Sequence, residues 1–174
     1  VVAGCVRLAL GAPILYRQER IGLGGRRFEV LKFRTMEPDR RVTTVAVADD
    51  RRRDHKAGHD PRHTALGRVL RRASLDELPQ LWSILKGDMS FVGPRPALFN
   101  QEDLIALRSS QGVDQLLPGL TGWAQVRYEY GSTIEDSVEK LQYDLYYVKN
   151  HSLFLDLLIM LETVAVVLTG KGAR

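Results

Sequence analysis

Residues 153–168 limit what this chain can fold into more than any other part of the sequence. Apart from Asp156, Glu162 and Thr163, this segment is apolar throughout. A helix that faces water along one side needs a broader polar stripe than these three residues provide. The segment is therefore expected to be a helix that is buried in a core or lies at a membrane interface.

A second apolar stretch begins the sequence. Residues 1–12 contain a single charged residue, Arg7, and end at Gly11 and Pro13. They lack the charged first region and the small-residue cleavage site of a signal peptide. No uninterrupted apolar run reaches the roughly 18 residues that a membrane-spanning helix needs. We expect residues 1–12 to be the later part of a hydrophobic segment whose first part lies upstream.

Composition restricts the class of protein only broadly. A chain of 174 residues with 44% hydrophobic and 26% charged residues is typical of one globular domain. The net charge of +4 and a pI near 9.4 predict an anionic partner: nucleic acid, a lipid headgroup or a phosphorylated small molecule. The single cysteine, Cys5, excludes an intrachain disulfide and fits a reducing compartment.

Local patterns predict an α+β fold that is mostly helical, with a small β-hairpin. Residues 14–16 and 28–33 are rich in β-branched and aromatic side chains, and glycines between them indicate a turn. Apolar periodicity predicts helices over residues 66–86, 101–115 and 134–147, and residues 118–123 are expected to form a turn-rich connector.

The charged region over residues 38–60 is expected to be a loop. His55, His59 and His63 recur every fourth residue, as metal ligands on a helix do. Gly58 and Pro61 interrupt any such helix, so the pattern disfavours a metal site there.

Two adjacent carboxylates, Asp76 and Glu77, lie between an arginine-rich segment and the apolar repeat of residues 78–85. Ser74 and Glu77 have the spacing of a capping box, but Pro79 favours a helix that starts nearer Asp76. Either start places the carboxylates in or beside a first helical turn, where the helix dipole favours an anion by roughly 0.3–1 kcal/mol. A structural cap and a functional site both explain the pair.

Arg95 lies between Pro94 and Pro96, which fix the backbone on either side of it. A rigidly presented guanidinium suits the bidentate recognition of a phosphate, although a structural salt bridge has the same appearance in a sequence.

Several motifs, taken together, resemble the bacterial sugar transferase family. These proteins are the monotopic polyprenyl-phosphate phosphoglycosyl transferases, and the similarity is greatest to the exopolysaccharide branch. The motifs occur in the family's order between about residue 14 and the end of the chain. They are Lys32-Phe33-Arg34-Thr35-Met36, residues 74–80, Gly87-Asp88-Met89-Ser90, Val92-Gly93-Pro94-Arg95-Pro96, residues 117–123 and Tyr143-Asp144-Leu145-Tyr146-Tyr147.

The resemblance implies a reaction and a place in the cell. A sugar phosphate would pass from a UDP-sugar to undecaprenyl phosphate, with release of UMP, at the cytoplasmic face of the bacterial inner membrane. Residues 1–13 would be the later part of a re-entrant membrane helix, and residues 14–174 the catalytic domain with interfacial amphipathic helices. The resemblance implies no nucleic-acid partner and leaves a homodimer open.

The resemblance also assigns roles to individual residues. Asp76 matches the nucleophile, and Glu77 matches the acidic partner associated with Mg²⁺. An anionic nucleophile that approaches a diphosphate needs neighbouring positive charges. Lys32, Arg71 and Arg95 match the phosphate-binding residues. Orientation or support is expected of a further group: Arg34, Thr35, Arg72 and Asp144.

Two other interpretations compete with the transferase. A basic nucleic-acid-binding domain would explain the pI and the arginine runs, but the chain lacks a known binding motif and the acidic pair would repel a phosphate backbone. A catalytically silent scaffold of a polysaccharide assembly complex would carry the same motifs without needing Asp76 for polymer production.

Overall fold

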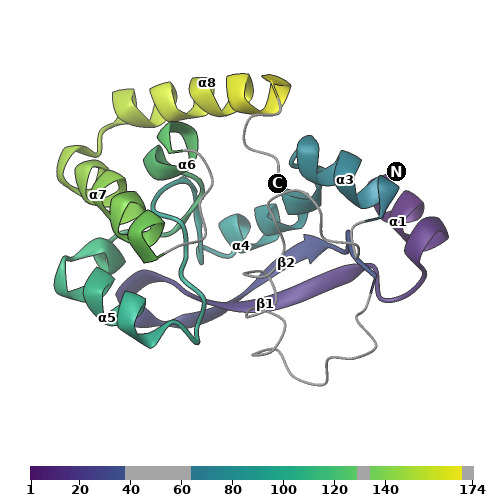
Figure 1. The fold of residues 1–174 in the computed structure, drawn as a ribbon, viewed down its shortest axis with the longest axis horizontal. Coiled ribbons are helices and arrows are strands. Elements are labelled where there is room, and N and C mark those ends of the chain that lie inside the picture. Colours follow the sequence, from purple (N-terminus) through teal and green to yellow (C-terminus); the bar gives the residue numbers. More distant parts are fainter. Residues whose placement is uncertain (38–63, 129–133, 170–174) are drawn as a thin grey trace.

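The computed structural model describes residues 1–37, 64–128 and 134–169. Within them helices predominate over two small sheets, which confirms the predicted α+β class (Figure 1). The elements follow in this order: α1 (Val2–Leu10), β1 (Leu15–Ile21), the 3₁₀ turn η1 (Leu23–Gly25), β2 (Arg27–Phe33), α3 (Ala65–Arg72), the 3₁₀ turn η2 (Leu75–Gln80), α4 (Leu81–Leu85), β3 (Ser90–Val92), α5 (Glu102–Ser110), the 3₁₀ turn η3 (Val113–Gln115), β4 (Gly119–Thr121), α6 (Trp123–Arg127), α7 (Ile134–Asn150) and α8 (Leu153–Thr169).

The predicted hairpin is present and is longer than the sequence indicated. β1 and β2 pair antiparallel from Leu15 opposite Phe33 to Ile21 opposite Arg27. At the turn, Gly24 and Gly25 have φ angles of 61° and 76°, which glycine adopts without the strain of a Cβ atom. Most of β1 is polar and open to water, so its side chains carry no apolar strand pattern.

A second sheet forms where the sequence predicted only a connector. β3 and β4 pair in parallel, with Ser90 opposite Gly119 and Val92 opposite Thr121. The glycine that suggested a turn instead permits a close backbone crossing. A Cβ atom on Gly119 would lie 2.1 Å from the backbone nitrogen of Gly93. Small residues here bring two chain segments together, which a local turn pattern does not reveal.

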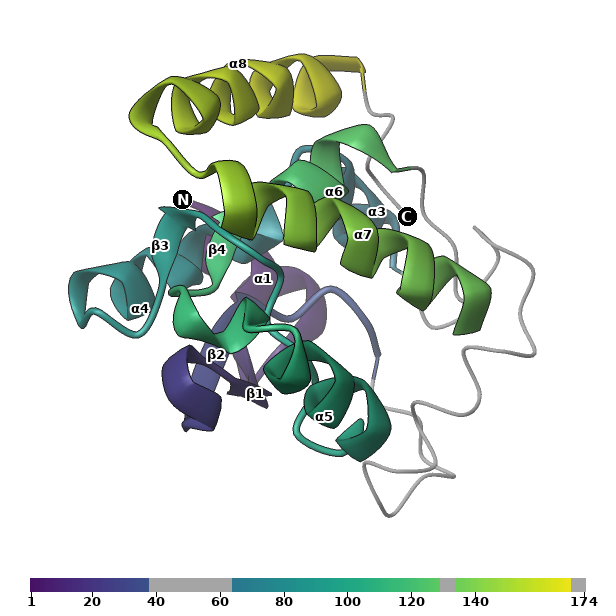
Figure 2. The same cartoon turned by 90° about the vertical axis from the view of Figure 1, so that its left-hand side faces the viewer.

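The main apolar cluster joins α7 and α8 to β3. Val92, Tyr147, Leu155 and Ile159 are all buried in it. The Tyr147 hydroxyl donates a 2.7 Å hydrogen bond to the Asp156 carboxylate, so the polar end of this buried ring has a partner. Helix α8 lies across α6 and α7 in both views of the ribbon (Figures 1 and 2).

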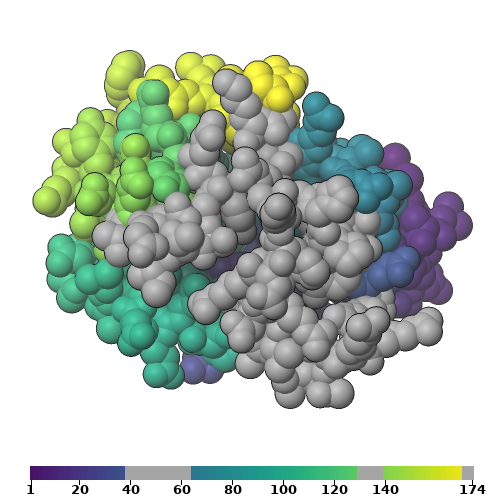
Figure 3. Space-filling view, in the orientation of Figure 1, coloured from purple at the N-terminus to yellow at the C-terminus, as the bar shows by residue number. Residues whose placement is uncertain are grey.

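Helix α8 has one buried face and one exposed face. Leu155 and Ile159 point into the core, whereas Phe154, Leu161 and Leu168 are 78%, 70% and 82% exposed. The helix is therefore not wholly buried, and its outer face is apolar. Figure 3 shows α8 at the surface along the upper edge of the molecule. None of the helices in the part of the chain that the structure describes is long and apolar enough to cross a membrane.

Helix α1 is tied to the end of β2 by one side chain. The Arg34 guanidinium donates hydrogen bonds to the carbonyl oxygens of Leu10 and Ala12, the latter at 3.1 Å. The backbone N–H of Arg34 also donates to the Ile14 carbonyl at 2.9 Å. The bond to Leu10 satisfies a carbonyl group in the last turn of α1, and the other two join residues just beyond the helix to the end of β2.

Candidate active site

The acidic pair lies in a 3₁₀ turn. Asp76 and Glu77 occupy the first turn of η2, and α4 begins only at Leu81. A helical turn thus begins beside the acidic pair, as predicted, but it is 3₁₀ and not α-helical, and the capping box that Pro79 disfavours is absent. Ser74 has a φ of 52° and its side chain makes no capping bond. Pro79 lies inside this turn and has no N–H to donate to a helical hydrogen bond.

The turn directs polar side chains inward and apolar ones outward. Asp76 and Gln80 are 7% and 4% exposed, and Ser83 on α4 is fully buried. By contrast, Trp82 and Leu85 are 58% and 78% exposed. The apolar repeat of this segment therefore forms an outer surface. An ordinary helix buries its leucines and exposes its polar residues. The reverse arrangement here indicates a functional site.

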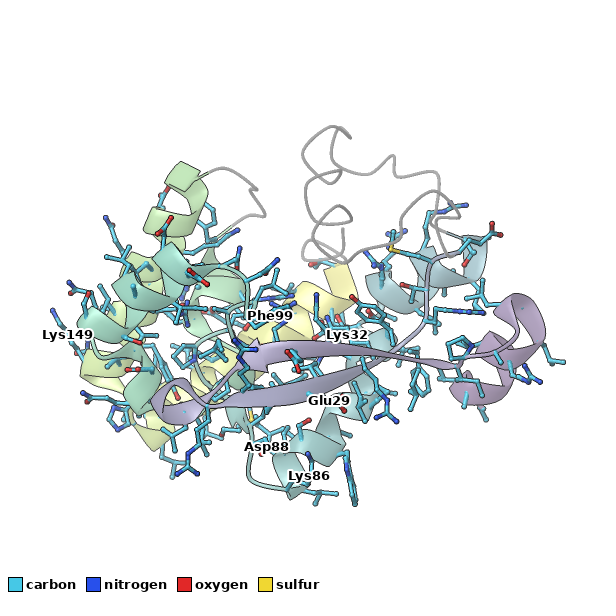
Figure 4. The ribbon with its side chains drawn as sticks, turned by 90° about the horizontal axis from the view of Figure 1, so that it is seen from below. Glu29, Lys32, Lys86, Asp88, Phe99 and Lys149 are labelled. Atoms are coloured by element: carbon cyan, nitrogen blue, oxygen red, sulfur yellow. The ribbon has the colours of Figure 1, made fainter. Side chains whose placement is uncertain are left out.

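The hairpin supplies the cation that faces this turn. Lys32, near the end of β2, forms an ion pair with the Glu77 carboxylate, and both side chains are about one-fifth exposed, at 20% and 22%. Figure 4 shows Lys32 and Glu29 on opposite sides of the hairpin, as strand alternation requires. The structure thus brings together two residues that lie 45 positions apart in the sequence.

Neighbouring charges separate the acidities of the two carboxyl groups. Burial raises the pKa of Asp76, and Lys32 and Arg71 oppose that rise only in part. Burial also acts to raise the pKa of Glu77, but Lys32 and Arg95 together outweigh it and leave this pKa lowered. Burial lowers the pKa of Lys32 despite Glu77. Adjacent carboxyl groups with diverging pKa values are typical of divided chemical roles.

Thr35 holds Arg71 beside the acidic pair. The Arg71 Nε donates a 2.9 Å hydrogen bond to the Thr35 hydroxyl, and its Nη2 donates to the Met36 sulfur at 3.2 Å. The Thr35 carbonyl in turn accepts a 3.3 Å bond from the Thr64 hydroxyl. A Cβ atom on Gly67 would lie 1.9 Å from that carbonyl oxygen, so glycine is what lets α3 approach the strand end.

A small pocket, open to solvent, lies against the Lys32–Glu77 pair. Asp76 is buried and is not one of its lining residues. The pocket walls combine three cations with one carboxylate and several uncharged groups: Arg20, Val30, Lys32, Glu77, Gln80, Arg95, Pro96, Gly119, Leu120 and Gln125.

None of the four predicted supporting residues lines the pocket, and Thr35 acts through Arg71 as described above. Arg34 bonds the end of α1, and Arg72 is exposed on α3. Asp144 is buried in α7, where its Oδ2 accepts a 2.8 Å hydrogen bond from Arg108. Burial raises the pKa of Asp144, and the Arg108 guanidinium offsets part of that rise.

Sequence reasoning missed Arg20, Gln80 and Gln125 as pocket residues. Arg20 belongs to a polar strand that gave no signal of pairing. Gln80 follows the acidic pair and could have been found from its position inside the motif. Gln125 has a buried side-chain oxygen with no hydrogen-bond partner among the described residues.

The histidine pattern at residues 55–63 and the loop over residues 40–59 lie outside the described residues. Within the residues that are described, no group of three or more His, Cys, Asp or Glu side chains is placed to hold a metal ion.

The family model for bacterial sugar transferases matches residues 1–170 of this chain. The chain belongs to the bacterial sugar transferase family. The expected family resemblance is thereby confirmed over almost the entire sequence.

Curated relatives place the family in lipid-linked sugar transfer. The chain is 38% identical to the UDP-N-acetylgalactosamine-undecaprenyl-phosphate N-acetylgalactosaminephosphotransferase of Aeromonas hydrophila, over 97% of this chain and 38% of that protein. It is 41% identical to the UDP-glucose:undecaprenyl-phosphate glucose-1-phosphate transferase of Caulobacter vibrioides, over 99% of this chain and 63% of that protein. It is 40% identical to the exopolysaccharide production protein ExoY of Sinorhizobium fredii, over 99% of this chain and 78% of that protein.

The chain therefore spans less than two thirds of the first two of these relatives. Their names include enzymes for different sugars, and none of the three supports the nucleic-acid-binding or scaffold interpretation.

The diverging pKa values predict opposite stability effects for two neighbouring substitutions. Because the pKa of Asp76 is raised in the folded protein, stability is lost as pH rises from its ordinary value of 3.8 through the folded value. Asp76→Asn removes this loss and should raise the Tm at pH 7.5. For Glu77, with a lowered pKa, ionisation stabilises the fold above its ordinary value of 4.5, so Glu77→Gln should lower the Tm.

Thermal unfolding at pH 7.5 measures both effects, and each kcal/mol corresponds to about 2–4 °C in a chain of this size. The two variants control for each other because they make the same chemical change at adjacent positions. A decrease in Tm for Asp76→Asn would mean that Lys32 and Arg71 outweigh burial, which contradicts the inferred direction.

Proposed function

We propose that this chain forms the catalytic part of a polyprenyl-phosphate phosphoglycosyl transferase. It would transfer a sugar 1-phosphate from a UDP-sugar to undecaprenyl phosphate, as an early membrane step of exopolysaccharide or related glycoconjugate synthesis. The observation that carries the proposal is the buried Asp76 beside the Lys32–Glu77 pair and a cationic pocket. The names of the relatives support the same donor and acceptor classes.

Asp76 would act as the nucleophile. One of its carboxylate oxygens would attack the phosphorus atom that bears the sugar, and the bond from that atom to the bridging oxygen would break. The bridging oxygen and its electron pair would leave with UMP, which produces an acyl phosphate on Asp76. A phosphate oxygen of undecaprenyl phosphate would then attack the same phosphorus atom and release the carboxylate.

The surrounding residues suit this two-step path. A raised pKa makes the Asp76 oxygen more basic, and hence a better nucleophile once it is ionised. Lys32, Arg71 and Arg95 would reduce the repulsion between this anion and the diphosphate. The cations therefore serve the substrate and the ionised nucleophile together.

We also propose a Mg²⁺ requirement. Mg²⁺ takes oxygen ligands and is commonly bound by one or two carboxylates together with substrate phosphates, so Glu77 with its lowered pKa fits as a protein ligand. When bound, the ion would neutralise part of the charge on the diphosphate. Glu77 would hold the ion through its carboxylate, whose Oε1 is also paired with Lys32.

The outer apolar surface fits a membrane-bound acceptor. Side chains of α8 are exposed at helical spacing, namely Leu153, Phe154, Leu157, Leu161, Val164 and Leu168. This surface would rest at the cytoplasmic face of the inner membrane, with residues 1–13 continuing a re-entrant segment. Undecaprenyl phosphate would reach the pocket from that lipid phase.

The nucleophile assignment predicts that Asp76→Asn lowers UMP release by at least about 10⁴-fold, as expected when a covalent nucleophile is removed. The assay supplies undecaprenyl phosphate and a panel of UDP-sugars to membrane-associated protein. Asp88→Asn is the matched control, since Asp88 is a nearby carboxylate paired with Lys86 at 2.7 Å. Wild-type turnover in Asp76→Asn would refute the assignment.

The cofactor proposal predicts that EDTA stops UMP release and that added Mg²⁺ restores it. Glu77→Gln should raise the Mg²⁺ concentration needed for half-maximal activity, whereas Asp88→Asn should leave it unchanged. Full activity in excess chelator would exclude the requirement.

The membrane proposal predicts that Phe154→Glu combined with Leu161→Glu reduces binding to vesicles of phosphatidylethanolamine and phosphatidylglycerol. The decrease should be at least about tenfold, because burying one large apolar side chain contributes about 1.5–3 kcal/mol. Cosedimentation measures it. Leu107→Glu is the control, since Leu107 is an exposed leucine on α5, at the end of the molecule away from α8 (Figures 1 and 2). Equal binding by all three proteins would exclude α8 as the contact.

A further inference from the structure

The segment that carries Arg95 is held through its carbonyl groups. Pro94 and Pro96 have no N–H, so this segment has few donors with which to join a sheet. The Pro94 carbonyl accepts a 3.0 Å bond from the Gly119 N–H, and the Ala97 carbonyl accepts a 3.0 Å bond from the Ile21 N–H. The Pro96 carbonyl accepts from the Arg20 guanidinium at 3.1 Å.

The remaining carbonyl, that of Arg95 itself, is held by a side chain from α5. Arg108 Nη2 donates a 2.9 Å hydrogen bond to the Arg95 carbonyl, while Nη1 donates a 2.8 Å bond to Asp144. Four successive carbonyl groups, those of residues 94–97, thus accept hydrogen bonds from donors on β4, α5 and β1. The orientation of the Arg95 backbone depends on all of them.

Asp144 fixes Arg108 in this bridging position. Its side chain is 3% exposed and that of Arg108 is 14% exposed, so the ion pair is largely shielded from water. A planar guanidinium is held in a single orientation when one nitrogen donates to a buried carboxylate and another donates to a backbone carbonyl. Neither residue lines the pocket beside Lys32 and Glu77.

We propose that Arg108 and Asp144 are positioning residues for Arg95, holding its backbone so that its guanidinium faces the donor diphosphate. This inference rests on the proposed function, which places the diphosphate in the pocket that Arg95 lines. It gives Arg108 a role that no motif indicated, and it explains why a carboxylate lies buried in α7 away from the reacting atoms. Arg95 would contact the diphosphate, and the other two would act through it.

The test replaces the buried pair by apolar residues in one double variant, Arg108→Met with Asp144→Leu. Such replacements of buried ion pairs are often neutral or stabilising, so the fold should persist with a Tm near that of the wild type. The Arg95 carbonyl loses its donor. The KM for the UDP-sugar that supports turnover should rise about tenfold, equivalent to 1.4 kcal/mol, while kcat changes by less than about threefold.

Hydrogen exchange gives a readout that needs no activity. The Gly119 and Ile21 amides donate to the segment, so both should exchange faster in the double variant, whereas amides within the β1–β2 ladder should not change. The control double variant, Arg127→Met with Glu162→Leu, removes an ion pair of 2.5 Å between α6 and α8. It should retain the wild-type KM and the wild-type exchange at Gly119 and Ile21.

Unchanged KM and unchanged exchange in the Arg108–Asp144 variant would overturn the proposal. So would a fall in Tm together with equal losses in kcat and kcat/KM, because the pair would then act only on stability. If the wild-type protein itself released no UMP, the proposed function would fail. Exchange at Gly119 and Ile21 would still decide whether the pair holds the segment.

Discussion

The Lys32–Glu77 ion pair is the interaction on which the arrangement of the site depends. It joins the hairpin to the 3₁₀ turn, and both charges are largely removed from water. Removal of either partner would leave an uncompensated charge in a poorly solvated place, which is costlier than loss of a surface pair. The hairpin and the turn are therefore coupled electrostatically as well as by packing, and neither can shift without disturbing Asp76.

This coupling explains how two neighbouring carboxyl groups come to differ. Glu77 points toward Lys32 and the pocket that Arg95 also lines, and its charge is favoured. Asp76 is buried, and Lys32 and Arg71 offset only part of the effect of that burial, so its charge is disfavoured. An ionised carboxylate whose charge is disfavoured reduces the stability of the fold. Such a residue is retained where function needs a reactive oxygen. The outward leucines and Trp82 on the same segment leave the inward direction to polar groups.

The sequence predicted the parts of the molecule that local patterns determine. The hairpin, α5, α7, α8 and the proximity of Lys32 to the acidic pair all follow from periodicity, glycine placement or motif order. The parallel β3–β4 pair was missed because each strand is short and its glycines serve a crossing that only tertiary structure reveals. Apolar spacing and Pro79 predict a helix start at the acidic pair, but they do not distinguish the 3₁₀ turn that forms there from an α-helix.

The sequence predicted some residues of the site and missed others. Motif resemblance named Lys32, Arg71, Asp76, Glu77 and Arg95, and the structure gathers these around the turn and its pocket. It could not indicate Arg20 or Arg108, because each acts on a carbonyl group of a distant segment. Backbone acceptors are the same in every residue, so sequence carries no trace of which one a side chain will reach.

The tie between Arg34 and the end of α1 bears on how the chain can be shortened. A division after residue 13 looks natural in the sequence, yet the Arg34 guanidinium reaches across it to Leu10 and Ala12. The side chain would keep its charge but lose those acceptors if the first helix were deleted, just two positions beyond Lys32. Any soluble version of this domain would therefore need to retain α1, or to replace Arg34 at the same time.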